Sequence, residues 1–283
     1  MSKSIEYSSK KKISTIFSDF DGTFAEFGKI PDDNLEIIKD FLKLNKENKF
    51  IINSGRPRSS LHKIILNSNL LKEYKNHQIG LISSGGVSAS FDGVMLWYNP
   101  LSFGKSHLIV ENIIENNSQG VISSIDGTYS FLDDKKTSTY ESFFKIEILK
   151  KPFLDRRIES GEFLKSSIKS FENLIDKYTN AYSFFPKEEN LGKEEWIFFV
   201  PKGIDKGSSI IKYEKLLGLN SKESLIIGDN WNDESMLSLE NRTTIVMGNA
   251  PRKLLNSSQI NYFTKTFKEN GFSYALKKIL NDF

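Results

Sequence analysis

The chain has 283 residues, with 39 basic and 36 acidic side chains, a net charge of +3 and no cysteine, which excludes disulfides, cysteine nucleophiles and cysteine metal ligands. The excess positive charge is scattered, unlike the concentrated basic stripe of a nucleic-acid-binding protein. No stretch approaches the roughly 20 apolar residues that span a bilayer, and the polar start (Met1–Lys12) lacks the apolar run of a secretory signal, so we expect a cytoplasmic protein without nucleic-acid or membrane partners.

The first 86 residues alternate between predicted strands and helices. Apolar runs predict buried strands at 13–17, 50–52 and 80–82. Apolar side chains spaced near 3.6 residues predict a helix over 34–48, opened by proline and acidic residues, and we expect another helix over 59–66. Strand–helix alternation is typical of parallel sheets, so we expect an α/β domain with a Rossmann-like parallel sheet.

The alternation of predicted strands and helices stops in the middle of the chain. Short apolar runs at 89–91 and 94–97 flank an Asp-Gly pair, which is a hairpin signal, and further apolar runs lie at 143–149 and 196–200. We therefore expect a separate α+β cap domain, inserted at residues 87–200.

The strand signal of the first domain returns near the end of the chain. Residues 225–227 and 244–246 are short apolar runs that predict buried strands. The core domain is therefore predicted to be discontinuous, formed by residues 1–86 and 201–283.

Two carboxylates follow the first predicted strand, in the run Asp19-Phe20-Asp21-Gly22-Thr23. Alternation along a strand places residues i and i+2 on one side, so Asp19 and Asp21 can share a site at the carboxyl end, where open parallel sheets bind ligands. Adjacent acids repel each other and favour a cation or a shared proton, which suits chemistry on a phosphate ester. On these residues alone, a capped Asp-Gly turn is an equal alternative.

Two further stretches have the residue types that bind an anion. Ser54-Gly55-Arg56 follows the second predicted strand, where a hydroxyl and free backbone N–H groups suit an anionic oxygen. The alternative is a plain turn with a surface arginine. Lys206 could neutralise a phosphate and steady a carboxylate, and Lys202 is an equally good candidate from the residues alone.

A second acidic pair, Asp229 and Asp233, follows the predicted strand at 225–227. If a turn of helix begins there, their four-residue spacing places them on one face. Both could then reach a hard cation that prefers oxygen ligands. The alternative is an acidic first turn that the helix dipole favours.

In order, these motifs resemble those of the haloacid dehalogenase superfamily, specifically its Cof-type sugar-phosphate phosphatases with an inserted α/β cap. Asp19–Thr23 is similar to the first motif, and Ser54-Gly55-Arg56 to the second, where threonine is the commoner first residue. Lys206 occupies the place of the third-motif lysine, and Gly228–Leu237 follows the fourth motif. Met247-Gly248-Asn249-Ala250 also resembles a signature of this branch, and the resemblance covers nearly the whole chain.

The resemblance implies catalysis through an aspartyl-phosphate. Asp19 would attack phosphorus, and Asp21 would protonate the leaving alcohol and then activate water. It further implies that the phosphate is held by Ser54, Gly55, Lys206 and Asn232. It implies a magnesium site formed by Asp19, the backbone carbonyl of Asp21, Asp229, and Asp233, the last acting through a water or by orienting Lys206.

We therefore expect a magnesium-dependent phosphatase for small phosphorylated metabolites, sugar phosphates in particular, that is a monomer or weak homodimer. A phosphomannomutase-like phosphotransferase and a catalytically silent regulatory module on the same fold are the alternatives.

The inserted unit is expected to be a lid that excludes water, with hinges near Gly85-Gly86 and 201–203. The candidate substrate contacts, each of which has a structural or merely exposed role as the simpler explanation, are His107, Tyr140, Lys145, Glu147, Lys187 and Trp196. The residues expected to form the cap core are Phe143, Phe144, Phe184, Phe185, Phe198 and Phe199.

Overall fold

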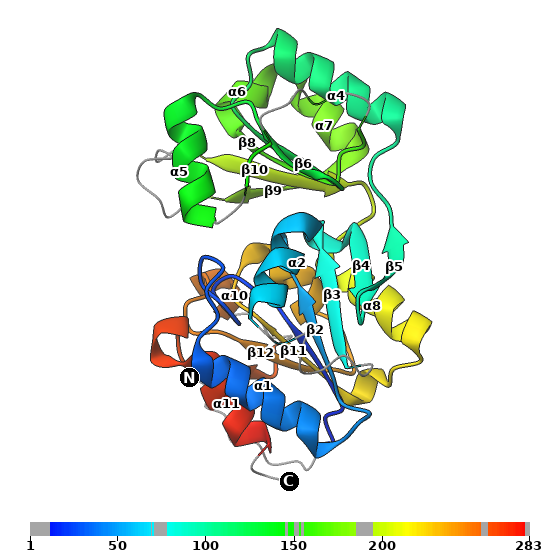
Figure 1. The fold of residues 1–283 in the computed structure, drawn as a ribbon, viewed down its shortest axis with the longest axis vertical. Helices are drawn as coiled ribbons and strands as arrows, with labels where there is room; N and C mark the ends of the chain where they lie inside the picture. The colour runs from blue at the N-terminus through cyan, green and yellow to red at the C-terminus, as the bar shows by residue number, and fades with distance from the viewer. Residues whose placement is uncertain are drawn as a thin grey trace.

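The chain forms two sheets, seen in a computed structural model that describes residues 12–68, 70, 78–144, 147–149, 153, 156–184, 195–255 and 260–280. Figure 1 shows the larger sheet with helices on both faces and the smaller sheet lying beyond the ends of its strands. The predicted fold class is confirmed: a parallel α/β core carries a separate, mainly antiparallel unit.

The larger sheet contains eight of the described strands. The first six in spatial order are parallel, and the last two continue the sheet in antiparallel pairing. In spatial order they are β13 (Tyr262–Phe263), β12 (Thr243–Val246), β11 (Ser224–Gly228), β1 (Thr15–Ser18), β2 (Lys49–Asn53), β3 (Ile79–Ser83), β4 (Ser88–Phe91) and β5 (Val94–Tyr98).

Helices cover both faces of this sheet, which explains why its central strands are apolar runs. Ile16 of β1 packs into one core and its neighbour Phe17 into the other. The helices on the Ile16 side are α1 (Asp32–Leu44), α2 (Arg58–Asn67) and α11 (Gly271–Leu280). Those on the Phe17 side are α8 (Lys206–Leu217), α9 (Glu234–Leu237) and α10 (Arg252–Leu255). The short 3₁₀ turns of this unit are η1 (Ser84–Gly86), η4 (Ser221–Glu223), η5 (Trp231–Asp233) and η6 (Phe267–Glu269).

Local chemistry sets the limits of α1. Pro31 precedes the helix in an extended conformation, and acidic residues 32 and 33 fill its first turn, where the helix dipole favours negative charge. The helix therefore starts two residues earlier than predicted. It ends at Leu44 because Asn45 is already extended, four residues before the predicted end.

The smaller sheet has five described strands, all paired antiparallel. Helices α4 (Phe103–Glu115) and α7 (Glu172–Tyr178) pack on the face of this sheet that is turned away from the core, around Phe163 and Phe199. In spatial order the strands are β7 (Gly127–Ser130), β6 (Gly120–Ser124), β8 (Ser160–Leu164), β10 (Trp196–Pro201) and β9 (Thr179–Phe184). The helices are α4 (Phe103–Glu115), α5 (Asp134–Phe144), α6 (Lys165–Ile168), η2 (Lys169–Phe171) and α7 (Glu172–Tyr178).

The predicted hairpin around Asp92-Gly93 forms, but in the core rather than in the inserted unit. β4 pairs with β3, and β5 pairs with β4, so the two strands extend the larger sheet. The predicted cap boundary at residue 87 is therefore wrong, and so is a first hinge at Gly85-Gly86, since the chain leaves the core only after Tyr98. We propose a cap formed by residues 99–200.

Part of the apolar run at 143–149 is described. Helix α5 continues through residue 144, and Ile148 makes an isolated bridge to Thr128.

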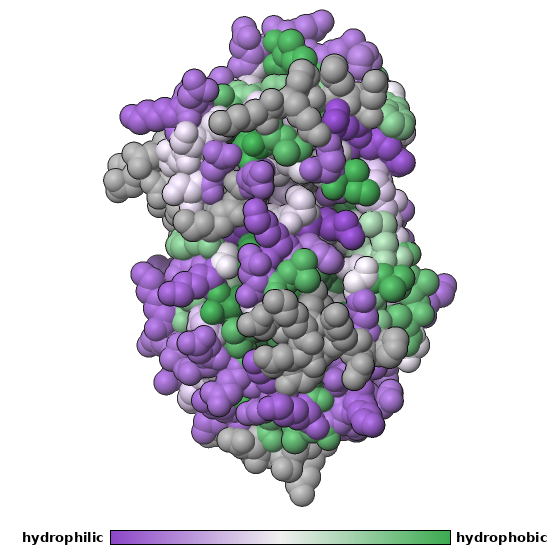
Figure 2. Space-filling view, viewed as in Figure 1, coloured by the Kyte–Doolittle hydropathy of each residue, from purple (hydrophilic) through white to green (hydrophobic). Residues whose placement is uncertain are grey.

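The surface view adds two observations. On the face shown in Figure 2, hydrophilic residues predominate and the hydrophobic ones form small, separate areas. Among the residues that the structure describes, every helix is too short or too polar to cross a bilayer.

Candidate active site

Three neighbouring parallel strands deliver one polar residue each to the same edge of the core. Asp19 follows β1, Ser54 follows β2 and Asp229 follows β11. The register pairs Ser18 with Ile227, and the N–H of Asp19 donates to the carbonyl of Ile227 at 2.9 Å. The sequence places these residues together correctly, because the carboxyl ends of parallel strands meet at one edge.

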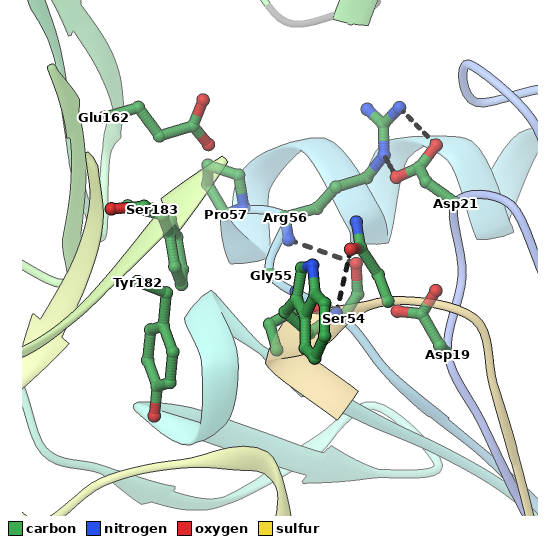
Figure 3. Close-up of a pocket in the computed structure, with 13 residues that line it drawn as sticks. Asp19, Asp21, Ser54, Gly55, Arg56, Pro57, Glu162, Tyr182 and Ser183 are labelled. Carbon is green, nitrogen blue, oxygen red and sulfur yellow. Dashed lines mark hydrogen bonds and ion pairs between the residues drawn. The ribbon is translucent and has the colours of Figure 1, made fainter. Parts of the chain in front are cut away.

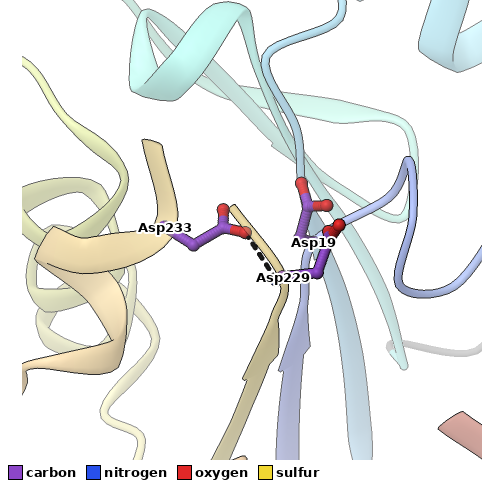
Figure 4. Close-up of side chains that lie close together, drawn as sticks. All are labelled: Asp19, Asp229 and Asp233. Atoms are coloured by element: carbon purple, nitrogen blue, oxygen red, sulfur yellow. Dashed lines mark hydrogen bonds between the residues drawn. The ribbon is translucent and has the colours of Figure 1, made fainter. Parts of the chain in front are cut away.

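Asp19, Asp229 and Asp233 form a buried carboxylate cluster (Figure 4). One oxygen of each lies within 4.8 Å of the others, and the residues are 5%, 5% and 0% exposed. Burial, followed by the charge of Asp233, raises the pKa of Asp19 well above its ordinary value and the pKa of Asp229 to about 7. The cluster therefore favours positive charge, and its oxygens are the donors that a hard divalent cation prefers.

Lys206 supplies part of that positive charge. Its Nζ donates to Asp19 Oδ1 at 2.5 Å and to Asp233 Oδ1 at 2.6 Å, and its side chain is 2% exposed. Burial lowers the pKa of Lys206, but the two carboxylates outweigh that effect and raise it above its ordinary value. Lys202, the other sequence candidate, is exposed and donates to the carbonyl of Asp176 instead.

The N-terminus of α8 sets the position of Lys206 in the site. Asp205 caps the helix by accepting from the N–H of Ser208, whose hydroxyl side chain interacts in return with the N–H of Asp205. A Cβ at Gly207 would lie 2.3 Å from the carbonyl oxygen of Ser235, so glycine allows α8 to approach the turn that carries the acidic residues.

Two side chains and one glycine orient Asp229. Thr23 Oγ1 donates to its Oδ1 at 2.9 Å, and Asn249 Nδ2 donates to its Oδ2 at 2.8 Å. Gly22 has φ +88°, and a Cβ there would lie 2.4 Å from Asp229 Oδ2. This explains the glycine of the first motif and gives the run at 247–250 a physical role, since Asn249 comes from it.

Asp233 is held on both of its oxygens. Oδ1 accepts from Lys206, while Oδ2 accepts from the backbone N–H groups of Asp229 at 2.9 Å and Asn230 at 3.0 Å. Of the two roles that the resemblance left open, the geometry therefore favours the orientation of Lys206.

Asp21 lies apart from this cluster. Its carboxylate accepts two hydrogen bonds from Arg56, from Nε at 2.5 Å and from Nη2 at 2.8 Å (Figure 3). Asp21 stands in the turn after β1 rather than in the strand, so the alternation argument does not hold at this residue. Both Asp19 and Asp21 line the same pocket, but the side chain of Asp21 is not among the clustered oxygens.

The pocket opens between the core and the smaller sheet. Ser54 Oγ accepts from the N–H of Arg56 at 3.0 Å, which shapes the turn after β2. Asn232 lines the pocket, and its buried Oδ1 lacks a hydrogen-bond partner among the described residues. The lining residues from the core are Asp19, Asp21, Ser54, Gly55, Arg56, Pro57, Asn230, Trp231 and Asn232. Those from the smaller sheet are Glu162, Tyr182, Ser183 and Phe198.

The sequence candidates from the inserted unit mostly lie elsewhere. Exposed His107 pairs with Glu111, Glu147 pairs with Lys63, and Trp196 is buried in a small core. Tyr140 does not line the pocket but donates to a residue that does, Glu162. Lys145 and Lys187 lie outside the described residues, as do residue 185 and the side chains of residues 143, 144 and 184.

Sequence reasoning missed the residues that the smaller sheet contributes to the pocket. Glu162 belongs to no motif, and Phe198 was expected in the cap core, where only its neighbour Phe199 lies. Alternation along β10 separates the two rings onto opposite faces of the sheet. That period-two pattern was visible in the sequence, but the face that meets the core was not.

Comparisons of the sequence identify a family. A family model described as haloacid dehalogenase-like hydrolase matches residues 16–276. The chain is similar to an uncharacterized protein of Mycoplasma capricolum subsp. capricolum, with 26% identity over 243 residues, 79% of this chain and 86% of the relative. It is also similar to a Streptococcus pyogenes protein whose provisional name is that of a phosphatase, with 30% identity over 145 residues, 50% of this chain and 48% of the relative.

Solved structures share the whole two-part fold. A haloacid dehalogenase-like hydrolase from Bacteroides thetaiotaomicron has a TM-score of 0.77 at 20% identity, covering 95% of this chain and 100% of that one. A subclass IIB sugar phosphatase of the same superfamily has a TM-score of 0.73 at 17% identity, covering 93% and 98%. At these identities the likeness establishes the fold.

Proposed function

The chain belongs to the haloacid dehalogenase-like hydrolases, and from this premise we propose a magnesium-dependent phosphatase that hydrolyses phosphate monoesters of small metabolites, sugar phosphates in particular. The observation that carries the proposal is the environment of Asp19. Its carboxylate is buried, lines the pocket, accepts a hydrogen bond from the ammonium group of Lys206 and lies close to two further carboxylates. A nucleophile for phosphorus and the charges that steady it thus occupy one place.

In this proposal Asp19 attacks phosphorus and the ester oxygen departs, so that an aspartyl-phosphate forms. Lys206, the hydroxyl of Ser54, the backbone N–H of Gly55 and the amide of Asn232 hold the phosphoryl oxygens. Phosphoryl transfer depends mainly on positioning and charge neutralisation, so this set is sufficient in kind.

Asp21 is proposed to move the proton. It gives a proton to the leaving alcohol and then takes one from the water that hydrolyses the aspartyl-phosphate. The side chain of Asp21 is 38% exposed, whereas that of Arg56 is 5% exposed, so the carboxylate is the more accessible partner of the pair. To act on the ester oxygen, Asp21 must give up at least one of its hydrogen bonds to Arg56.

The donor set at the strand ends fits Mg²⁺. Three buried carboxylates lie together near one ammonium group, and burial, followed by the charge of Asp233, raises the pKa of Asp229. We propose that Asp19, Asp229 and the backbone carbonyl of Asp21 hold the ion, with Asp233 acting through Lys206. When bound, the ion stabilises negative charge on the phosphoryl group.

The direct test is hydrolysis of p-nitrophenyl phosphate by the full-length protein. We expect inorganic phosphate to be released with Mg²⁺, to stop with excess EDTA and to resume when Mg²⁺ is restored. A protein that releases no phosphate under any of these conditions would be a catalytically silent module, and the proposal would be wrong.

A second measurement separates hydrolysis from phosphoryl transfer between sugar positions. We expect incubation with a hexose 1-phosphate to yield free hexose and phosphate in equal amounts. Formation of the 6-phosphate isomer without free phosphate would favour the mutase-like alternative.

A further inference from the structure

Three side chains of the smaller sheet form one row above the proposed reaction centre. Glu162 on β8 pairs with Phe198 on β10, which in turn pairs with Tyr182 on β9. Directly opposed residues of antiparallel strands project from the same face of a sheet. All three line the pocket, and Figure 3 shows Glu162 and Tyr182 across it from Asp19 and Asp21.

The row is fixed relative to the phosphate-binding turn. Near the start of β8, Glu159 Oε2 accepts from Ser84 Oγ at 2.8 Å, and the N–H of Ser84 donates to the carbonyl of Arg56 at 2.8 Å. A Cβ on Gly55 would lie 3.7 Å from Phe198 Cζ, so the centre of the row touches the same turn. The two sheets therefore meet at defined points around the pocket.

A hydrogen bond from Tyr140 orients the carboxylate of Glu162. Tyr140 Oη donates to its Oε2 at 2.8 Å, and among the described residues this is the hydrogen bond that the structure records for this carboxylate. Tyr140 and Glu162 both experience the positive charge of Arg56 across the pocket. An oriented acceptor therefore points into the space that the leaving group must occupy.

The charges around that space select among leaving groups. Of the described residues that the smaller sheet contributes to the lining, Glu162 alone is charged, so a carboxylate or second phosphate on the leaving group would meet repulsion. Arg56 faces the same space, and its charge is paired with Asp21. A neutral group rich in hydroxyls avoids the repulsion and offers donors to Glu162.

We propose that the Glu162–Phe198–Tyr182 row is the leaving-group subsite and that it selects neutral, ring-form sugar phosphates, with Glu162 as the specificity-determining residue. This inference rests on the proposed phosphatase function. Glu162 accepts hydrogen bonds from the hydroxyls of the sugar, and the ring of Phe198 covers an apolar face of the sugar ring. Tyr182 limits the other end of the subsite.

The test compares kcat/KM among esters at pH 8, with full-length protein and Mg²⁺. Glucose 6-phosphate, glucose 1-phosphate and ribose 5-phosphate are the neutral esters, 6-phosphogluconate and 3-phosphoglycerate the anionic ones, and phosphoethanolamine the cationic one. p-Nitrophenyl phosphate, which lacks hydroxyls, is the reference. We expect the best neutral sugar ester to exceed every charged ester by at least about 10-fold, since a pocket built for hydroxyls discriminates strongly.

The variant Glu162→Gln keeps the shape of the side chain and removes its charge. We expect kcat/KM for the best sugar ester to fall by about 10–100-fold, the range for a hydrogen bond to a charged group, and p-nitrophenyl phosphate to change by less than about 3-fold. Tyr140→Phe should cause a smaller loss in the same direction, because the carboxylate remains. Glu115→Gln, an exposed change on α4, is the matched control.

Two results would overturn the inference: a charged ester as the best substrate, or an unchanged ratio between the kcat/KM values for sugar and aryl esters in Glu162→Gln. Each is distinct from failure of the proposed function, in which the wild-type protein would not hydrolyse p-nitrophenyl phosphate either.

Discussion

Lys206 Nζ lies 2.5 Å from Asp19 Oδ1, although 187 positions separate the two residues in the chain. The same ammonium group also binds Asp233, so one cation holds two of the three clustered carboxylates. Both ends of the Lys206–Asp19 contact are almost completely buried, at 2% and 7% side-chain exposure. The contact therefore contributes both to the stability of the fold and to the proposed chemistry.

Replacement of the nucleophile should remove activity without unfolding the protein. We expect Asp19→Asn to lower kcat on p-nitrophenyl phosphate by at least about 10³-fold, because an amide does not displace the ester oxygen. Thermal unfolding should show an unchanged or higher Tm, since the variant removes a carboxyl whose pKa is raised by burial and then by the charges of Asp233 and Asp229. Wild-type turnover in this variant would refute the assignment.

Loss of the lysine should destabilise the protein strongly. Lys206→Met leaves the carboxylates of Asp19 and Asp233 buried without their cation, and removing one partner of a buried ion pair costs about 3–5 kcal/mol. Urea unfolding without Mg²⁺ should report this loss, and added Mg²⁺ should recover part of it. The control is Lys202→Met, an exposed lysine in the same segment. Equal midpoints for the two variants would contradict the prediction.

The metal requirement should depend on Asp229. We expect Asp229→Ala to raise the Mg²⁺ concentration for half-maximal activity by at least about 10–100-fold, the effect already seen when only an outer-shell partner is lost. Exposed Glu240→Ala should leave the Mg²⁺ titration unchanged. If Asp229→Ala titrates as the wild type does, Asp229 does not bind the ion.

The proton-transfer role of Asp21 predicts a kinetic signature. p-Nitrophenol is a good leaving group that needs little protonation, so Asp21→Asn should still be phosphorylated by its ester. The following attack of water should slow by about 10²–10⁴-fold, the usual contribution of a general base. Rapid mixing should therefore show a burst of p-nitrophenol equal to the enzyme, together with trapped phosphoenzyme. Steady turnover with neither signal would exclude this role.

The free energy of unfolding should depend on pH through the ionisation of Glu162. Burial, partly offset by the hydrogen bond from Tyr140 and by the charge of Arg56, raises the pKa of this carboxyl from 4.5 to about 7. The folded state therefore binds the extra proton between these values. The contribution of the protonated carboxyl to stability is complete below about pH 4.5 and is lost as pH rises through about 7.

The glutamine in Glu162→Gln cannot ionise, so this variant does not lose that stability as pH rises. We expect its Tm, relative to wild type, to be higher at pH 8 than at pH 5, with about 2–4 °C of shift for each kcal/mol in a protein of this size class. Glu115→Gln should show the same difference at both pH values. A Glu162→Gln difference that does not vary with pH would mean that the carboxyl titrates normally.

The sequence predicts the strand-end residues well, and the reason is geometric. Asp19, Ser54 and Asp229 follow apolar runs that form adjacent parallel strands, so placing the strands also places the residues. The choice between Lys206 and Lys202 is different. Lys206 is the buried one because it begins α8, which packs against the turn after β11, whereas Lys202 stays exposed.

Two other features depend on contacts that local patterns do not encode. The hairpin β4–β5 is visible as two strands, but its pairing with β3 is a tertiary choice. Nothing in the sequence distinguishes Glu162 from the other glutamates. Its place in the pocket depends on how the smaller sheet packs against the core. The Arg56–Asp21 pair joins two recognised motifs, yet nothing in either motif indicates that they bind each other.

The connections between the two units have a mechanical consequence. Residues 99–102 join β5 to α4, and residues 202–205 join β10 to α8. Each connection can extend by at most about 3.6 Å per residue, which limits how far the cap could separate from the core. The second connection ends at Lys206, so the segment that joins the cap to the core leads directly into the residue that binds Asp19.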